Sequence, residues 1–426
     1  MYQYFNFLKY FCPMIPEIPS LAALHADDFD YDLPQHQIAV EPKPDRDSSK
    51  LLVYKDNAII EDTYHNIVNY LDANHFLVFN NSKVVQARLQ FDRGVGKKIE
   101  IFCLEPADKS VDMTLALQKK GQVEWRCFVG NLKKWKEKVL SMQIPIGKDF
   151  FVLSAELLEK EYDSWVVQLS WDKEDLVFAD VLEAAGKIPL PPYIEREARD
   201  DDKITYQTIY AKDQGSVAAP TAGLHFTQHV FDSFKNKGIV YEYLTLHVGA
   251  GTFKPVKNTL IKEHQMHDEQ VLIEKRFLEK LLQQVLQGNK IVAVGTTSAR
   301  FLESIYWMGC KVGADANSHS LDLGQWEAYS IPELTVENSL RKLIQFFTDQ
   351  KIEKLQARTS IMIVPGYNWK MADKLVTNFH QPKSTLVMLV SSFLGGNWKV
   401  VYNYALNNDF RFLSYGDGCL LEVNRS

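Results

Sequence analysis

Cysteine is scarce in this chain of 426 residues, which contains only five. Their number is odd, they are scattered, and no two of them have the Cys-x-x-Cys spacing: Cys12, Cys103, Cys127, Cys310 and Cys419. A disulfide framework or a zinc site built from cysteine is therefore not expected. Such cysteine usage is typical of a reducing compartment, and we expect a cytoplasmic location.

Long apolar runs are lacking as well. No segment reaches the roughly 18 uninterrupted apolar residues that a membrane helix requires. The longest uncharged candidate, near the C-terminus, is interrupted by Lys383. The aromatic N-terminus has neither a basic stretch nor a small-residue cleavage site, and Pro13 and Pro16 interrupt it. We therefore expect no membrane span, and we interpret the N-terminal segment as an extension rather than a signal peptide.

An excess of positive charge is also absent, since 48 Lys and Arg face 54 Asp and Glu for a net charge of −6. Proteins that grip duplex nucleic acid over much of their surface are usually basic, so any nucleic-acid contact should be a local patch. With 46% hydrophobic and 24% charged residues, the composition is that of a globular, enzyme-sized protein. The length suits two or three domains of roughly 150 residues each.

The pattern of elements changes along the chain. From about residue 76 to residue 171, short strand-like segments such as KIEIFCL and SWVVQLSW alternate with turns. Evenly spaced short strands predict a small β-barrel or β-rich insert. After residue 171, short apolar strands alternate with helices. We therefore predict an α/β, barrel-like main domain of residues 1–80 and 172–426, which carries an inserted all-β (β-barrel) domain of residues 81–171.

Boundary signals locate several elements of the main domain. Helices are predicted over residues 175–186, 227–238, 277–288 and 384–396, and two more begin at Thr297 and Thr335. The segments VYEYLTLHV, IVAV and SIMIV are predicted strands. Repeated strand–loop–helix units favour a parallel sheet or barrel, whose ligands bind in loops at the carboxyl ends of the strands.

The first loop that fits such a site is GSVAAPTAGLHF, residues 215–226. Its small side chains allow the backbone to approach a flat ligand, and the helix that follows offers free N–H groups. His225 supplies a polar group where that helix begins. Composition alone favours the alternative, which is tight packing of a helix on a sheet with a capping histidine.

Two further loops have similar features. HVGAGTF, residues 247–253, follows a predicted strand, but the third glycine of a dinucleotide-binding fingerprint is absent. VGTTSAR, residues 294–300, leads from a strand into a helix, where a carboxylate or phosphate could bind beside Arg300. A Thr or Ser cap with a solvated arginine is the alternative for that loop.

Five of the 11 histidines lie between residues 225 and 267. The pairs His225/His229 and His264/His267 have the spacing of zinc ligands, but a carboxylate or cysteine that would complete a catalytic zinc set is not evident. Acid–base chemistry suits these side chains better, because the histidine pKa lies near working pH. Each histidine taken alone could equally be structural.

One basic run, KKWKEK at residues 133–138, stands out in the β-rich segment. It could contact phosphates, with Trp135 available for stacking on a base. A solvated charged face is the alternative.

Sequence motifs between residues 29 and 417 follow one another in a recognisable order: VFNNSKVVQARL, GKIPLPPYIERE, GSVAAPTAGLHF, TLHVGAGTFKPV, VAVGTTSARFLES and TNFHQPKSTLVMLVSSF. This order resembles the family of S-adenosylmethionine:tRNA ribosyltransferase-isomerases of queuosine biosynthesis, and PTAGLHF and HVGAGTF are specific to that family. Two features depart from its pattern. Lys83 stands where the family usually has arginine, which replaces a guanidinium fork by a point charge. The span from Gly309 to Pro365 is longer than is common.

The resemblance implies an unusual transfer. The ribosyl part of S-adenosylmethionine moves to the aminomethyl group of a modified 7-deazaguanine (preQ1) at the tRNA wobble position and rearranges to epoxyqueuosine, with release of adenine and methionine. S-adenosylmethionine is consumed as a substrate, and no metal is expected. The implied partner is a tRNA anticodon loop, and we expect a monomer. A non-catalytic tRNA-binding relative and a paralogue with a different acceptor are the alternatives.

That reaction requires a base for the proton next to the sulfonium, an acceptor for the proton of the amine and a donor to the departing adenine. The catalytic candidates are His247, His225 and His267, with Glu269 orienting His267. The candidates for binding S-adenosylmethionine are Gly223, Phe226, Gly249, Gly251, Thr252, Phe253, Thr297 and Arg300. The candidates for tRNA contact are Tyr193, Arg196, Lys133, Lys134 and Lys136. For this assignment to hold, the loops of Gly223, Gly249 and Gly295 must meet in one cavity.

Overall fold

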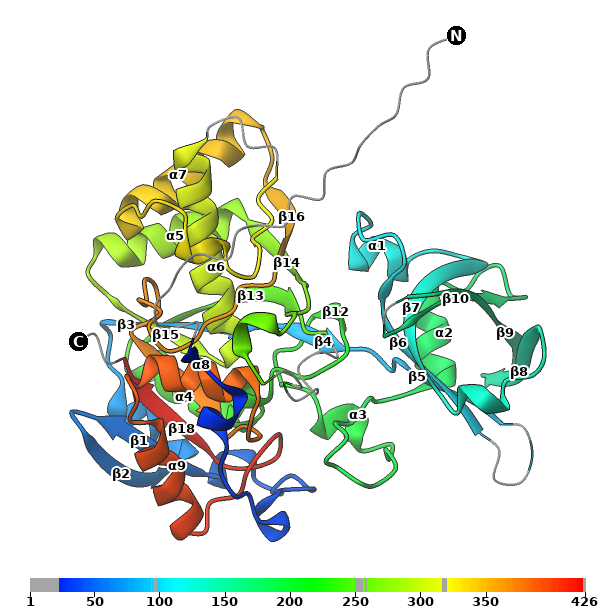
Figure 1. Ribbon diagram of the computed structural model, residues 1–426, viewed down its shortest axis with the longest axis horizontal. Coiled ribbons are helices and arrows are strands. Elements are labelled where there is room, and N and C mark those ends of the chain that lie inside the picture. The colour runs from blue at the N-terminus through cyan, green and yellow to red at the C-terminus, as the bar shows by residue number, and fades with distance from the viewer. Residues whose placement is uncertain are drawn as a thin grey trace.

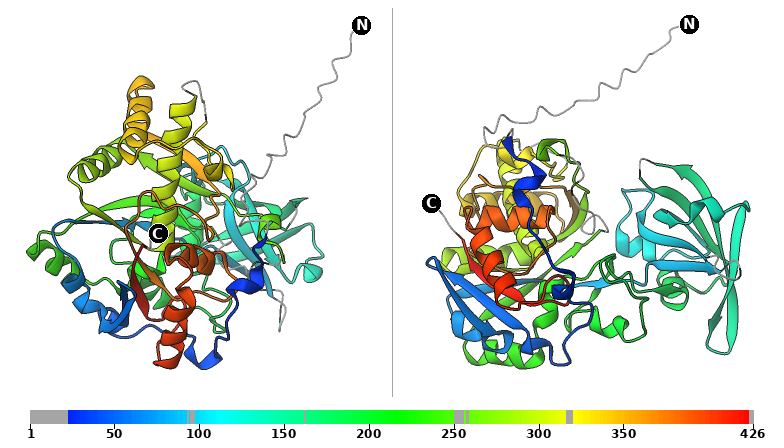
Figure 2. Two further views of the ribbon diagram at one scale, coloured as in Figure 1. Left: turned by 60° about the vertical axis from the view of Figure 1, so that its left-hand side comes forward. Right: turned by 60° about the horizontal axis from the view of Figure 1, so that its bottom comes forward.

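The structure is a computed structural model that describes residues 23–92, 94, 98–161, 163–249, 256, 259–315 and 320–423. Two large sheets, each with its own hydrophobic cluster, divide the chain into a larger α/β part and a smaller β part (Figure 1). The two parts lie side by side in Figure 1 and in the right-hand view of Figure 2. Between them, β4 (Ser82–Val84) pairs in parallel with β12 (Asp213–Ser216).

The larger sheet has nine strands in the order β16-β14-β13-β3-β15-β17-β18-β1-β2. Their bounds are β1 Lys50–Lys55, β2 Ala58–Thr63, β3 His75–Asn80, β13 Val240–His247, β14 Glu269–Glu274, β15 Lys290–Val294, β16 Lys354–Thr359, β17 Lys374–Asn378 and β18 Gly418–Glu422. The central strands β13, β3, β15 and β17 run parallel. They are buried along most of their length, and their carboxyl ends therefore meet at one edge of the sheet.

Helices flank this sheet, and the mixed α/β class predicted from the sequence is confirmed. Their bounds are α3 Asp202–Thr205, α4 Gln228–Asn236, α5 Lys275–Leu286, α6 Thr296–Ala314, α7 Val336–Asp349, α8 Thr385–Phe393 and α9 Trp398–Asn407. Thr227, Thr335 and Ser384 cap α4, α7 and α8, each through its hydroxyl oxygen. The helices predicted at these positions are therefore confirmed. Within the described part of the chain, none of the helices is both long and apolar enough to cross a membrane.

Two predicted boundaries are wrong. SIMIV, residues 360–364, lies after β16 and outside any strand, because its backbone bonds to a neighbouring loop instead of a ladder. Met362 N–H donates to the Gln325 carbonyl (3.0 Å), and Val364 N–H donates to the Tyr329 hydroxyl (3.3 Å). Helix α2 (Phe178–Ala185) is capped at Val177 rather than Asp175, because the Asp180 carboxylate accepts the Val177 N–H.

The smaller sheet has seven antiparallel strands in the order β11-β5-β6-β7-β10-β9-β8. Their bounds are β5 Arg88–Asp92, β6 Lys98–Pro106, β7 Gln122–Gly130, β8 Val139–Ile146, β9 Asp149–Lys160, β10 Trp165–Trp171 and β11 Gly186–Lys187. Helices α1 (Met113–Leu117) and α2 contribute to its hydrophobic cluster. Trp135 also belongs to that cluster and is 8% exposed. The expectation that its ring is available for stacking on a base is therefore wrong.

Candidate active site

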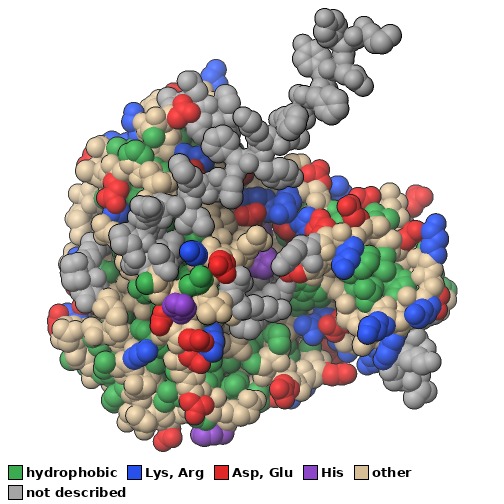
Figure 3. All heavy atoms as spheres, in the orientation of Figure 1, with side chains coloured by type: hydrophobic (Ala, Val, Ile, Leu, Met, Phe, Trp, Pro, Cys, Tyr) green, Lys and Arg blue, Asp and Glu red, His purple; other side chains and the backbone are tan. Residues whose placement is uncertain are grey.

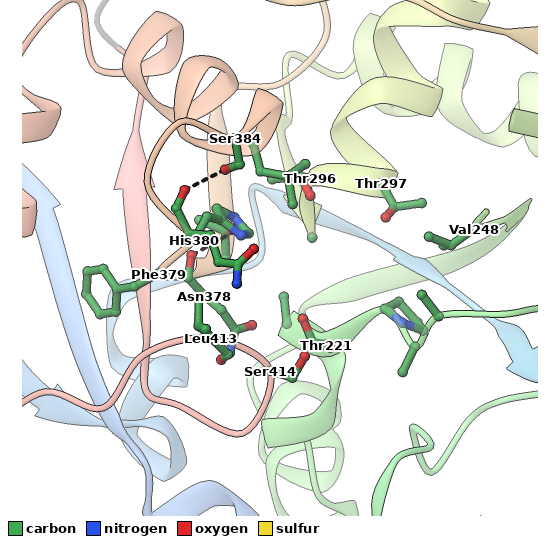
Figure 4. Close-up of a pocket in the computed structure, with 18 of the residues that line it drawn as sticks. Thr221, Val248, Thr296, Thr297, Asn378, Phe379, His380, Ser384, Leu413 and Ser414 are labelled. Carbon is green, nitrogen blue, oxygen red and sulfur yellow. Dashed lines mark hydrogen bonds between the residues drawn. The ribbon is translucent and has the colours of Figure 1, made fainter. Parts of the chain in front are cut away.

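A cleft opens at the edge of the larger sheet where the parallel strands end (Figure 4). We call it the sheet-edge cleft, and its unfilled space is about 730 Å³. The loop after β15 contributes Gly295, Thr296 and Thr297, the 218–222 segment contributes its small residues, and Val248 follows β13. The three loops expected to converge therefore line one cleft. Of the three glycines, only Gly295 lines it.

Gly223 faces away from this cleft. A Cβ at Gly223 would lie 2.0 Å from the Tyr210 hydroxyl oxygen, so close packing on Tyr210 requires glycine there. Phe226 is also outside the cleft, because its ring is fully buried among Phe79, Phe231 and Phe234. The expectation that Phe226 offers a ring face to a bound sulfonium is therefore wrong. Gly251, Thr252 and Phe253 lie outside the described residues.

Two helix N-termini border the sheet-edge cleft. Helix α6 begins at Thr296, after Gly295 with a φ of 92°, and Thr296 and Thr297 line the cleft. Helix α8 begins after Ser384, which lines it too. None of the described residues that line this cleft is Asp, Glu, Lys or Arg. The positive ends of the two helix dipoles therefore favour an anionic group beside otherwise neutral walls.

The far wall comes from Asn378 at the end of β17, from Phe379 and His380 in the loop after it, and from Leu413 and Ser414 (Figure 4). Burial lowers the pKa of His380 to about 3, and its Nε2 lies 2.8 Å from the Thr377 hydroxyl. The motif TNFHQPKS, residues 377–384, was not among the segments predicted to line the site. The available signal was a polar loop between an apolar strand and a capped helix, the same pattern that identified residues 294–300.

His225 lies behind this wall rather than in the cleft. Its ring stacks on Tyr64 with centroids 4.2 Å apart and an interplanar angle of 20°. Burial, with added repulsion from Arg411 and other cations, lowers the pKa of His225 to about 3. The imidazole is therefore neutral at physiological pH. It contacts Asn378 and lines a separate, smaller pocket beside Arg46 and Tyr415 rather than the sheet-edge cleft.

A second cleft, the inter-sheet cleft, lies between the larger and smaller parts, with an unfilled space of about 670 Å³. His247, Gly249 and His267 line it, opposite residues of β6 and β7 such as Glu105 and Phe128. Val248 lines both clefts, so the two are adjacent. Acidic and basic side chains gather where the two parts meet (Figure 3), and Arg358 of β16 pairs with Glu105 of β6 at 3.2 Å.

His247 is 6% exposed, and burial lowers its pKa to about 4, although Asp112 and Asp213 oppose that shift. Its Nδ1 is buried and has no hydrogen-bond partner among the described residues. A neutral imidazole with an unused ring nitrogen can accept or donate a proton. Among the described residues, no group of three or more His, Cys, Asp or Glu is arranged to hold a metal ion.

Glu269, expected to orient His267, forms an ion pair with Arg300, and each side chain is 4% exposed. Burial raises the pKa of Glu269, and the Arg300 charge opposes that rise. Arg300 is thus neither solvated nor part of the cleft wall. Its Nε and Nη2 are buried without a hydrogen-bond partner in the described part of the chain.

The residues expected to contact tRNA are dispersed. Tyr193 lines the sheet-edge cleft, and its hydroxyl lies 2.6 Å from the Ser414 hydroxyl. Arg196 is held by the Asp202 carboxylate at 2.7 and 2.8 Å and by Glu41 at 3.0 Å. All four lysines of the basic run are exposed on the smaller part: the three candidates Lys133, Lys134 and Lys136, and Lys138. Lys83, which departs from the family pattern, is exposed on β4.

Comparison with known proteins gives consistent matches. A family described as queuosine biosynthesis protein matches residues 26–421. A protein of Sulfurihydrogenibium sp. (strain YO3AOP1), named S-adenosylmethionine:tRNA ribosyltransferase-isomerase, is 37% identical over an alignment of 403 residues that covers 92% of this chain and 98% of that protein. A protein of Halothermothrix orenii with the same name is 36% identical, and the alignment covers 93% of this chain and 100% of that protein. A crystal structure of S-adenosylmethionine tRNA ribosyltransferase from Thermotoga maritima covers 92% of this chain and 99% of its own, with 28% identity and a TM-score of 0.44.

Proposed function

The chain belongs to the family of queuosine biosynthesis proteins. From this membership we infer which of the two substrates binds in each of its two clefts. The enzyme is a tRNA ribosyltransferase-isomerase of queuosine biosynthesis, which transfers and isomerises the ribosyl moiety of S-adenosylmethionine. In our proposal the acceptor is the aminomethyl group of 7-deazaguanine at the tRNA wobble position, the product is epoxyqueuosine, and adenine and methionine leave.

We propose that S-adenosylmethionine binds in the sheet-edge cleft. The half-buried Tyr193 lines it, and aromatic faces attract a sulfonium. The methionine carboxylate fits the N-terminus of α6 at Thr297, where free N–H groups and the helix dipole favour an anion. This combination of uncharged walls with a helix N-terminus is the observation that carries the assignment.

The tRNA nucleobase that receives the ribosyl group fits the adjacent inter-sheet cleft. A wobble base that leaves the anticodon stack needs a recess for its ring and an acceptor for the proton of its ammonium group. His247 meets the second requirement, since its imidazole is neutral at physiological pH and its Nδ1 lacks a partner among the described residues. His267 lines the same recess and can supply a second acid or base. The ribosyl group would then cross between the clefts beside Val248.

We further propose that residues 81–171 form an inserted β-barrel domain that guides tRNA. Six of the strands of the smaller sheet lie in this range, and they share one hydrophobic cluster. The exposed lysines after β7 give it a local basic patch on a chain with a net charge of −6. The proposed enzyme acts as a monomer in the cytoplasm and uses no metal.

Adenine release tests the function. Incubation with S-adenosylmethionine and preQ1-bearing tRNA should release one adenine for each base modified, with or without EDTA. Binding of tRNA without adenine release would identify a non-catalytic relative. Release that is equally fast with tRNA lacking the modified base would identify a different acceptor.

A further inference from the structure

Asn378, at the end of β17, contributes its side-chain amide to the wall of the sheet-edge cleft. One end of this amide lies 3.2 Å from the Leu413 carbonyl oxygen and 3.3 Å from His225 Nε2. A carbonyl oxygen only accepts hydrogen bonds, so the amide nitrogen must be the atom that faces it. His225 Nε2 must then be the acceptor of the second N–H. The chemistry of these neighbours fixes which way the amide points.

His225 is neutral and fixed in place, as an acceptor of the Asn378 hydrogen bond must be. It is 3% exposed, stacks on Tyr64 and hydrogen-bonds to the backbone of Arg46. Because burial lowers its pKa to about 3, the ring is neutral at physiological pH and carries a single proton. Since Nε2 faces the N–H of Asn378, that proton is on Nδ1. The ring therefore acts as a fixed acceptor for Asn378.

The remaining amide atom, Asn378 Oδ1, is buried and has no partner among the described residues. A buried acceptor without a donor is unfavourable, and the few such groups in native proteins often belong to binding sites. In Figure 4, Asn378 lies with Leu413 and Ser414 on one side of the cleft, facing the α6 residues Thr296 and Thr297 across it.

The walls around Asn378 define the ligand group that fits. None of the described lining residues carries a full charge, so an ammonium group would find no carboxylate there. The half-buried Tyr193 gives the cleft aromatic surface, which suits a flat ring with a neutral N–H donor. The exocyclic amine of adenine is such a donor.

We propose that Asn378 Oδ1 accepts a hydrogen bond from the 6-amino group of the adenine of S-adenosylmethionine, and that His225 is a positioning residue that fixes the Asn378 amide. This inference rests on the proposed function of the sheet-edge cleft. It gives His225 a role different from the acid–base role expected from the sequence. It also explains how a cleft whose described lining residues carry no full charge selects an adenine nucleoside.

Equilibrium binding of S-adenosylhomocysteine and S-inosylhomocysteine tests the proposal, because a 6-oxo group turns the donor into an acceptor. The native protein should bind the adenosyl compound at least roughly tenfold more tightly. Asn378→Ser should weaken adenosyl binding and bring the ratio close to one. A native protein that binds both compounds equally overturns the proposal without any variant. A loss seen instead with the 2′- or 3′-deoxy analogue would place a ribose hydroxyl on Oδ1 and also overturn it.

The His225 variants test positioning separately. His225→Gln keeps an acceptor and should keep the adenosyl preference, whereas His225→Phe keeps the stacked ring but removes the acceptor and should lose most of it. His229→Ala, an exposed change on α4, is the control and should leave the ratio unchanged. If His225→Gln and His225→Phe have the same ratio of affinities for S-adenosylhomocysteine and S-inosylhomocysteine, His225 does not position Asn378. Absence of adenine release by the native enzyme would instead contradict the proposed function, so the two failures are distinguishable.

Discussion

Gly215 lies so close to His247 that a Cβ at residue 215 would come within 2.8 Å of both Nδ1 and Cε1 of the imidazole. The same Cβ would lie 2.4 Å from Cγ of Met113, and Gly215 has a φ of +142°. Both the backbone conformation and the space require glycine. Gly215 therefore sets how far His247 can move within the inter-sheet cleft.

Gly215→Ala should displace the His247 ring and lower turnover by roughly tenfold or more, because small displacements of a catalytic group are costly. The measurement is the rate of adenine release at saturating S-adenosylmethionine and tRNA. Gly147→Ala is the matched control, since Gly147 also has a positive φ (+62°) but no described atom within 4 Å of an added Cβ. Equal turnover of both variants would show that the position of His247 is not important.

His247→Ala should remove most of the turnover while leaving tRNA affinity nearly unchanged. The reason is that a single neutral side chain contributes little to binding a polyanion but is the proposed acceptor of the amine proton. Single-turnover adenine release and a filter-binding titration measure the two effects separately. Normal release by this variant would remove His247 from the reaction.

The buried histidines should make the protein less stable in mild acid. Burial lowers the folded-state pKa to about 3 for His225 and about 4 for His247, below the roughly 6.5 of an unfolded chain. The unfolded state therefore binds more protons as pH falls below about 6.5, so the contribution of each histidine is complete above that pH and is lost toward the folded-state pKa. Between pH 7 and pH 5, each should cost on the order of 2 kcal/mol of unfolding free energy.

Urea unfolding at pH 7 and pH 5 measures this loss. His225→Gln should be less sensitive to the change of pH by the amount assigned to one histidine, whatever its stability at pH 7. The same substitution at exposed His229 should leave the pH dependence unchanged. An identical dependence in the native protein and His225→Gln would contradict the lowered pKa.

The Glu269–Arg300 pair should be sensitive to the loss of one partner. Arg300→Met or Glu269→Gln should destabilise the protein by roughly 3–5 kcal/mol, because removing one partner leaves an unpaired buried group. The double variant with Met at both positions should recover part of that loss. The exposed i,i+4 pair Glu337–Arg341, at 2.8 Å, is the control, and breaking it should cost only roughly 0.3–0.5 kcal/mol. Urea unfolding of all the variants measures whether breaking the buried pair costs more unfolding free energy than breaking the exposed pair.

Local signals explain what could be predicted. Thr227 and Thr335 cap their helices as expected, because a hydroxyl followed by an apolar periodic stretch is a feature of contiguous sequence. The convergence of three loops followed from the rule that parallel strands end at one edge. The strand predicted for SIMIV was wrong because an apolar run of five residues has the same composition in a strand and in a buried loop.

Partners distant in sequence could not be predicted. Arg300 was expected at a ligand and is buried against Glu269, which lies 31 residues away. His225 was expected as an acid or base and contacts Asn378, which is 153 residues away. Spacing along the chain specifies which face of an element a side chain occupies, but the neighbour that it meets depends on how the elements pack. The roles of buried polar groups therefore became visible only in the fold.

The last prediction concerns the proposed tRNA contact of the basic run. Lys133, Lys134 and Lys136 are exposed, so their replacement by alanine should leave stability unchanged. If they neutralise phosphates, tRNA affinity should fall, and the slope of log affinity against log salt should become shallower by roughly 0.7–0.9 for each phosphate that is no longer neutralised. The matched control replaces the exposed Lys342 and Lys351 at α7 and should change neither quantity. Because Trp135 is buried in the core of the smaller sheet, base stacking does not supplement these lysines, and their effect should be purely electrostatic. An unchanged salt slope in the triple variant would show that the run is a solvated face and that tRNA is held elsewhere.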